Sequence, residues 1–206
     1  MSLAPVIERI LAERLVVLLR AVDDPDRLVG ELVKAGLGVV EITMDSAGAE
    51  GAISRARERG DVRVVAGTVR TPEQVERAAA AGAEACVAPV YTADVVTRSL
   101  ELGLPVIPAA LTPSEIETAF RAGAALVKLF PADAFGPSYV RHVLAPLADV
   151  PILASGGIDA ENARTYLDSG ARAVALGSSV TKAADPAAAA RAAVAAVRAP
   201  ARPSCA

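Results

Sequence analysis

The sequence is poor in the residues that nucleic-acid and metal sites require. Of its 206 residues only 3% are aromatic, tryptophan is absent, and the net charge is -3. A nucleic-acid-binding face needs basic charge and stacking rings, so this composition argues against a nucleic-acid partner. The single histidine, His142, has no cysteine cluster around it, and Cys86 and Cys205 lack the spacing of a zinc site. We therefore expect no metal and no other cofactor.

Long apolar runs are also missing. The N-terminus carries a charge every few residues and lacks the continuous apolar core of a signal peptide. The uncharged stretch at 102–114 contains three prolines and is too short to cross a bilayer. Hydrophobic residues nevertheless make up 53% of the chain, enough for a sizeable core. The sequence therefore predicts a soluble cytoplasmic protein without a membrane partner.

One pattern repeats along the chain: a short apolar run, a polar turn and then an amphipathic helix. Two of these helices start with the same signal, a threonine N-cap followed by proline, at Thr71 and Thr112. Strands that alternate with helices of about 10–15 residues indicate βαβ units and a parallel sheet. The eight apolar runs are 15–20, 37–43, 62–69, 85–90, 105–110, 125–131, 151–157 and 173–180.

Eight such units predict a closed (β/α)₈ barrel, the TIM-barrel fold, as a single domain over residues 1–198. An extra helix at about 4–14 precedes the first strand and is expected to cover the bottom of the barrel. An open doubly wound sheet uses the same alternation and is the alternative, but no G-x-G-x-x-G motif follows the first strand. We expect the last residues, 199–206, to form a disordered tail.

A lysine interrupts the sixth apolar run, A-L-V-K-L-F-P. Lys128 is one of three lysines, and the other two have polar neighbours. In a parallel barrel the reactive groups lie at the C-terminal ends of the strands. Glu41 and Thr68 hold such positions in the second and third runs, and Thr43 shares the face of Glu41. The upper interior is therefore expected to bring together an amine, a carboxylate and hydroxyl groups.

Two interpretations of this buried charge are possible. Because burying a charge costs several kcal/mol unless it is paired, Glu41 and Lys128 can simply satisfy each other as a core ion pair. Alternatively, burial favours a neutral lysine amine, which forms a Schiff base with a carbonyl group, while Glu41 acts as general acid and base. The position of both residues, together with a phosphate-binding signature further along the chain, favours catalysis.

That signature consists of two glycine-rich turns after the seventh and eighth runs, A-S-G-G-I and L-G-S-S-V. Loops at these strand ends often bind phosphate in this fold, because backbone N–H groups approach the ligand closely where no side chain intervenes. Ordinary tight turns are the alternative, but two such turns at these two strand ends favour phosphate. The predicted phosphate-binding residues are Ser155, Gly156, Gly157, Gly177, Ser178 and Ser179.

The motifs V-V-E-I-T, V-V-A-G-T-V, V-K-L-F-P-A, S-G-G-I and L-G-S-S resemble those of the 2-dehydro-3-deoxyphosphogluconate (KDPG) and 4-hydroxy-2-oxoglutarate (KHG) aldolases, over roughly residues 14–180. This resemblance implies a trimeric (β/α)₈ barrel that needs no metal and cleaves a phosphorylated keto acid to pyruvate and glyceraldehyde 3-phosphate. It implies Lys128 as the Schiff-base lysine and Glu41 as an acid/base that works partly through water. The other implied substrate contacts are Thr68 for the pyruvyl carboxylate, Pro89 through its backbone, Phe130 as an apolar wall, and Arg20.

Three positions depart from the family pattern. Asp45 stands where many members have an arginine for the substrate carboxylate, which an aspartate would repel, and galactonate-type relatives have a neutral polar residue there. A-P-V-Y at 88–91 replaces Ser-Pro-Gly, and A-S-G-G at 154–157 replaces Pro-Thr-Gly-Gly. The leading expectation is a class I aldolase acting on KDPG. The alternatives are the same chemistry on the phosphogalactonate epimer or on KHG, a phosphate-ligand-binding barrel without turnover, and another phosphate-binding barrel enzyme such as an isomerase or synthase.

Overall fold

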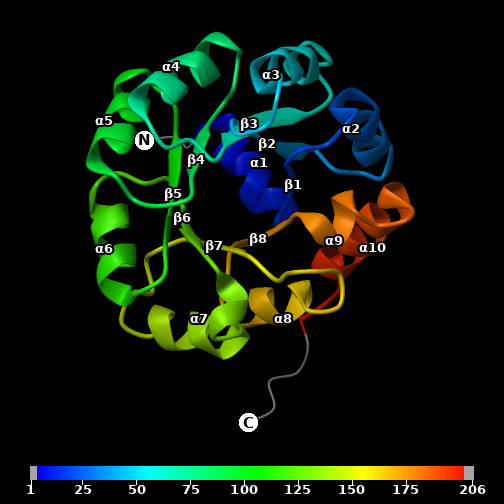
Figure 1. Cartoon of the computed structure of the whole chain (residues 1–206). Coiled ribbons are helices and arrows are strands. Elements are labelled where there is room, and N and C mark those ends of the chain that lie inside the picture. Colours follow the sequence, from blue (N-terminus) through cyan, green and yellow to red (C-terminus); the bar gives the residue numbers. More distant parts are fainter. Residues whose placement is uncertain (1–3, 202–206) are drawn as a thin grey trace.

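The computed structural model describes residues 4–201, and its centre is a closed barrel in which each strand pairs in parallel with the next and β8 pairs with β1 (Figure 1). The helices surround the strands as an outer ring. This architecture confirms the predicted (β/α)₈ barrel and rules out the open sheet. The strands are β1 (Leu15–Leu19), β2 (Val39–Thr43), β3 (Arg63–Gly67), β4 (Cys86–Ala88), β5 (Val106–Ala110), β6 (Val127–Leu129), β7 (Ile152–Ser155) and β8 (Ala173–Leu176).

Every predicted apolar run contains one of these strands, but several runs extend beyond the strand itself. The clearest case is the eighth run, where the strand ends at Leu176 and the following serines begin a short helix. The helices are α1 (Pro5–Glu13), α2 (Pro25–Lys34), α3 (Ala49–Glu58), α4 (Pro72–Ala80), α5 (Ala93–Glu101), α6 (Pro113–Arg121), the 3₁₀ helix η1 (Ala132–Ala134), α7 (Pro137–Leu144), α8 (Ala163–Asp168), α9 (Ser178–Thr181) and α10 (Pro186–Arg198).

Two apolar layers hold the barrel together. The outer layer joins strands to the surrounding helices, and the inner layer fills the barrel itself. The inner layer contains Val39, Val65, Leu126 and Leu153, which lie in or directly before four different strands. Along each strand every second side chain points into the barrel. The same alternation places Glu41 two residues after Val39, and Lys128 two residues after Leu126, on the inner face above this apolar floor.

The extra N-terminal helix closes the bottom of the barrel, as predicted. Val6, Ile7 and Ile10 of α1 belong to the inner apolar layer together with side chains of the strands. Glu13, the last residue of α1, accepts a hydrogen bond from the backbone N–H of Gly38 just before β2 (2.8 Å). Because α1 blocks this end, a ligand reaches the interior from the opposite, C-terminal end of the strands.

No helix in the described part of the chain is long and apolar enough to cross a membrane. Within residues 4–201 no group of three or more histidine, cysteine, aspartate or glutamate side chains is arranged to hold a metal ion. Cys86 is buried in β4, and burial raises the pKa of its thiol to about 11. The predicted tail, 199–206, lies largely outside the described residues, so its disorder stays a prediction.

Candidate active site

Lys128 and Glu41 meet inside the barrel. They come from β6 and β2, which lie four strands apart in a barrel of eight and therefore face each other across the interior. Lys128 Nζ lies 3.5 Å from Glu41 Oε1. The lysine is 5% exposed and the glutamate is completely buried. The pairing that the sequence predicted from two separate strand ends is thus present in the structure.

The surroundings of this pair leave the carboxylate with unused hydrogen-bonding capacity. Neither oxygen of Glu41 receives a hydrogen bond from any described residue. Burying a carboxylate without hydrogen-bond donors costs free energy, and buried polar groups in proteins normally have partners. An exception of this kind indicates a functional group. Lys128 Nζ also lies 5.9 Å from the centre of the Phe130 ring, a cation–π distance. The arrangement suits a site that accepts a hydroxyl group and a carbonyl group from a ligand.

Arg20, Thr68 and Asp45 meet at the mouth of the barrel, above the buried pair. Arg20 Nη2 donates a hydrogen bond to Thr68 Oγ1 (2.9 Å), and Arg20 Nε lies 3.5 Å from Asp45 Oδ2. Arg20 follows β1, Asp45 follows β2 and Thr68 follows β3, so three neighbouring strand ends contribute. The carboxylate of Asp45 therefore faces a cation of this chain.

The backbone is strained at this mouth. Thr68 has a φ angle of 55° and Ala21 a φ angle of 49°, both in the left-handed region that β-branched and alanine residues rarely adopt. Ser46 supports the first strand end, since its Oγ accepts a hydrogen bond from the N–H of Ala21 (2.9 Å) and lies 2.9 Å from Thr43 Oγ1. Strain of this kind gathers at functional sites, where the surrounding structure maintains it.

The two glycine-rich turns lie side by side, as the phosphate hypothesis requires. Ser179 of α9 donates a hydrogen bond to the carbonyl of Ile158 (2.8 Å), which joins the β8–α9 turn to the β7–α8 turn. Gly156 and Gly157 have φ angles of 98° and 66°. The hydroxyl group of Ser179 therefore donates its proton to a carbonyl group of the protein itself. The structure thus brings the predicted phosphate residues together: Ser155, buried at the end of β7, Gly156, Gly157, Gly177, Ser178 and Ser179.

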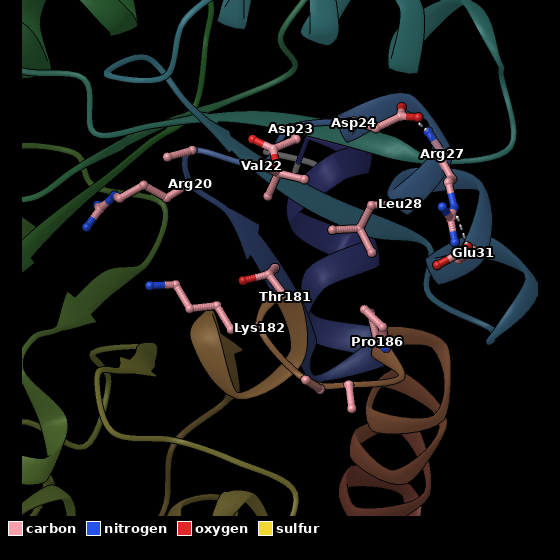
Figure 2. A pocket seen from close by; sticks show the side chains of 13 residues that line it. Arg20, Val22, Asp23, Asp24, Arg27, Leu28, Glu31, Thr181, Lys182 and Pro186 are labelled. Atoms are coloured by element: carbon pink, nitrogen blue, oxygen red, sulfur yellow. Dashed lines mark hydrogen bonds and ion pairs between the residues drawn. The ribbon is translucent and has the colours of Figure 1, made fainter.

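Two cavities flank the mouth. One of about 390 Å³ lies between the β1–α2 loop and the chain around α9, and it includes Arg20 and Lys182. Figure 2 shows these two side chains extending to the same side, while Arg27 pairs with Glu31 (2.9 Å) on the other. The other cavity, of about 360 Å³, is lined by Pro89 and Phe130 among others. Neither of these two cavities is lined by Lys128, which is 5% exposed.

Two residues of the site escaped the sequence analysis. Gly67 lies beside the Glu41 side chain, and Ser46 fixes the end of β1. Gly67 belongs to the quoted motif V-V-A-G-T-V, but a motif does not reveal which side chain fills the space beside a glycine. Ser46 could not be found from the sequence, because the loop residue that it supports, Ala21, lies 25 positions earlier in the chain.

Several known proteins are similar to this chain in both sequence and fold. The family model for KDPG and KHG aldolases matches residues 7–196. The chain is 36% identical to the 2-dehydro-3-deoxy-6-phosphogalactonate aldolase of Escherichia coli (strain K12) over 174 residues, 82% of this chain and 85% of that protein. It is 39% identical to the 2-dehydro-3-deoxy-phosphogluconate aldolase of Haemophilus influenzae over 154 residues, 74% of this chain and 73% of the relative. A solved structure described as native KDPGal superposes with a TM-score of 0.85 at 34% identity, covering 89% of this chain and 94% of that chain.

Proposed function

The chain belongs to the KDPG and KHG aldolase family, so it is an aldolase, a lyase, and we propose that it works as a class I enzyme through a Schiff base on Lys128. The observation that supports this mechanism is the buried pair itself. A primary amine on the inner face of the barrel lies 3.5 Å from a carboxylate whose oxygens accept no hydrogen bond from the described residues. An amine beside an acid/base group is what imine chemistry requires.

The proposed cycle starts when Lys128 Nζ attacks the C2 ketone of the substrate. Loss of water gives a protonated imine between Nζ and C2. Glu41, acting through a water molecule, accepts the proton of the C4 hydroxyl. The C3–C4 bond then breaks, its electron pair moves into the imine to form an enamine, and the aldehyde leaves. Protonation of the enamine at C3 and hydrolysis of the imine release pyruvate and return the free amine.

The residues at the mouth are proposed to bind the two ends of the substrate. Thr68 and Arg20 would bind the carboxylate end, because a hydroxyl and a guanidinium group lie within 2.9 Å of each other there. Pro89, through its backbone, and Phe130 would form the wall beside the imine. The phosphate would bind at the two joined turns, through Ser155, Gly156, Gly157, Gly177, Ser178 and Ser179.

The substrate that we propose is KDPG, cleaved to pyruvate and glyceraldehyde 3-phosphate. The phosphogalactonate epimer is the second candidate, because the galactonate-type relative covers the larger share of this chain, 82% against 74%. Unphosphorylated KHG is the third. The first two substrates are epimers that release the same products. Initial rates of pyruvate release from each purified substrate therefore give the comparison, and the highest kcat/KM identifies the substrate.

The variant Lys128→Ala tests the mechanism on the same substrates. We expect it to lose essentially all turnover while remaining folded, because the other two lysines, Lys34 and Lys182, are exposed on the surface. Undiminished pyruvate release by Lys128→Ala would contradict the Schiff-base mechanism. A folded wild-type protein that binds the phosphorylated acids but releases no pyruvate would instead indicate a binding barrel without turnover.

We further propose a homotrimer in the cytoplasm, with no nucleic-acid or membrane partner. The exposed apolar side chains of Val90 and Phe135, which are 51% and 59% exposed, are consistent with a surface that another subunit covers. Light scattering on the purified protein distinguishes a trimer from a monomer. A monomer at micromolar concentration would contradict the proposed assembly but leave the chemistry unaffected.

A further inference from the structure

The Glu41 side chain lies against the last residue of the neighbouring strand, Gly67 of β3. A Cβ atom built on Gly67 would stand 2.7 Å from Cγ and 2.8 Å from Cδ of Glu41, and closer still to Oε1. Real Cβ atoms essentially never approach another heavy atom within 3.0 Å. All three of the nearest atoms belong to Glu41, so a methyl group at this position would collide with the carboxylate first.

The backbone does not require a glycine at this position. Gly67 is absent from the glycines with positive φ angles, in contrast to Gly156 and Gly157. It pairs with Thr43 in the parallel β2–β3 ladder, and its carbonyl accepts a hydrogen bond from the N–H of Met44 (2.8 Å). An alanine can adopt this extended conformation. What the glycine supplies is therefore space rather than conformational freedom.

That space is where the reactive oxygen of Glu41 lies. The oxygen nearest to the virtual Cβ, Oε1, is also the oxygen 3.5 Å from Lys128 Nζ. Since no described residue donates a hydrogen bond to either oxygen, packing and the ion pair with Lys128, rather than hydrogen bonds, hold the carboxylate in place. A side chain at position 67 would push the carboxylate away from its present position beside the amine.

We propose that Gly67 is a positioning residue for the aldol chemistry: its missing side chain keeps open the space in which Glu41 faces Lys128. This inference rests on the proposed Schiff-base function, in which Glu41 moves the protons. It assigns a role to a residue that has no side chain of its own to react, and it predicts that the smallest possible addition, one methyl group, is enough to disturb proton transfer.

The variant Gly67→Ala tests the inference through the split between kcat and KM. We expect kcat for pyruvate release to fall by about 10²–10⁴-fold, the range for a lost general base. KM should stay within about threefold, because the three atoms nearest to the added methyl group all belong to Glu41 and none to Thr68, Arg20 or the phosphate-binding turns. Borohydride trapping with saturating pyruvate should still place an adduct on Lys128. The matched control is Gly30→Ala in α2, where the nearest atom to a virtual Cβ is 3.8 Å away, and it should keep the wild-type kcat.

A double-mutant cycle with Glu41→Ala shows whether the loss passes through Glu41. Once the glutamate is shortened, adding Gly67→Ala should cost neither further kcat nor further thermal stability, since the methyl group then has room. This comparison of melting temperatures also decides the matter if Gly67→Ala alone does not fold. A wild-type kcat in Gly67→Ala, or a further loss of kcat or melting temperature in the double variant relative to Glu41→Ala, would overturn the inference.

The same series separates this inference from the proposed function. If the wild-type protein neither releases pyruvate nor forms a trapped adduct, the proposed function has failed. The melting temperatures of the cycle still report on the contact between the two positions in that case. If the wild type is active and Gly67→Ala matches it, only the positioning role is contradicted.

Discussion

Single charges at the mouth of the barrel decide how an anionic substrate is received. The sequence predicts that Asp45 repels the substrate carboxylate, because the family resemblance implies an arginine at this position. In the structure Asp45 lies 3.5 Å from Arg20, and Arg20 also donates to Thr68. Both side chains of the ion pair are about half exposed, at 53% and 46%. The aspartate thus offsets part of the positive charge of Arg20, rather than standing alone as a repulsive group.

Removing this charge should strengthen substrate binding. The variant Asp45→Asn keeps the shape of the side chain and leaves Arg20 without its counter-charge. We expect KM for the anionic substrate to fall by about two- to fivefold with kcat unchanged, since an exposed ion pair is worth at most about 1 kcal/mol. Steady-state kinetics at low salt measure the effect, which should shrink in about 1 M salt because the charges are screened.

The control for this variant is Asp61→Asn, which removes another exposed carboxylate that pairs with an arginine, Arg59 (3.0 Å). Asp61 precedes β3 and therefore lies at the opposite end of the barrel from the mouth. Its removal should leave KM unchanged. A KM that rises in Asp45→Asn would mean that the aspartate helps Arg20 to bind the substrate instead of weakening it.

The buried pair could be predicted from the sequence because side chains alternate between the two faces of a strand. Lys128 and Glu41 continue the inner faces that begin at Leu126 and Val39, so two-residue alternation alone places them inside the barrel. The role of Gly67 and the partner of Arg20 were not predictable in the same way. Both contacts join residues of neighbouring strands or strand ends. They depend on side-chain orientations that are fixed only in the folded barrel, and the sequence pattern does not contain them.

At the scale of single elements, the N-cap residues of the helices fix where each loop that follows a strand ends and the next helix begins. The helix α6 begins with a complete capping box: Thr112 accepts a hydrogen bond from the N–H of Glu115, and the Glu115 side chain accepts one from the N–H of Thr112 (2.8 Å). The backbone hydrogen bonds from Thr112 and Leu111 lower the pKa of Glu115. The helix α5 begins with a threonine too, Thr92, but without a side-chain cap.

The variant Thr112→Ala should therefore lower the free energy of unfolding by about 1 kcal/mol, the usual cost of a lost N-cap. Urea denaturation measures this change. The matched control is Thr92→Ala, because the buried hydroxyl of Thr92 has no hydrogen-bond partner among the described residues. That substitution should cost much less or stabilise the protein. Equal losses in both variants would contradict the assignment of the capping box.

The lowered pKa of Glu115 adds a pH dependence of known sign. A carboxyl group whose pKa is lower in the folded state stabilises the fold above its unfolded pKa of about 4.5. This contribution disappears as the pH falls through the folded pKa. The difference in stability between the wild type and Glu115→Gln should therefore shrink in acid, below about pH 4.5, and remain constant near neutrality.

At the scale of the whole molecule, the barrel is closed at one end and reactive at the other. The helix α1 packs its apolar side chains into the inner layer at the N-terminal ends of the strands. The site residues lie above this apolar layer on the inner face of the barrel or in the loops that follow the strands. Eight apolar runs and one amphipathic N-terminal segment were sufficient to predict this arrangement. The exact strand ends were not predictable, because apolar residues continue past some of them into the loops, as in the sixth run, where Phe130 and Pro131 follow Leu129.

This division predicts that stability and activity can be changed separately. Ile10 of α1 is fully buried in the inner layer. The variant Ile10→Ala should lower the free energy of unfolding by about 2–5 kcal/mol, the usual cost of a cavity in a core. At temperatures where the variant is folded, kcat and KM should remain those of the wild type. A large change in kcat without a loss of stability would mean that α1 influences the reactive end directly.

The most direct test of the whole account is borohydride reduction in the presence of pyruvate, followed by peptide mass spectrometry. Lys128 lies on the inner face of β6 next to Glu41, with 5% of its surface exposed. The account predicts a pyruvate-derived adduct on Lys128 in the wild type, and none on Lys34 or Lys182. Folded protein in saturating pyruvate that yields no adduct on Lys128 would contradict the Schiff-base mechanism.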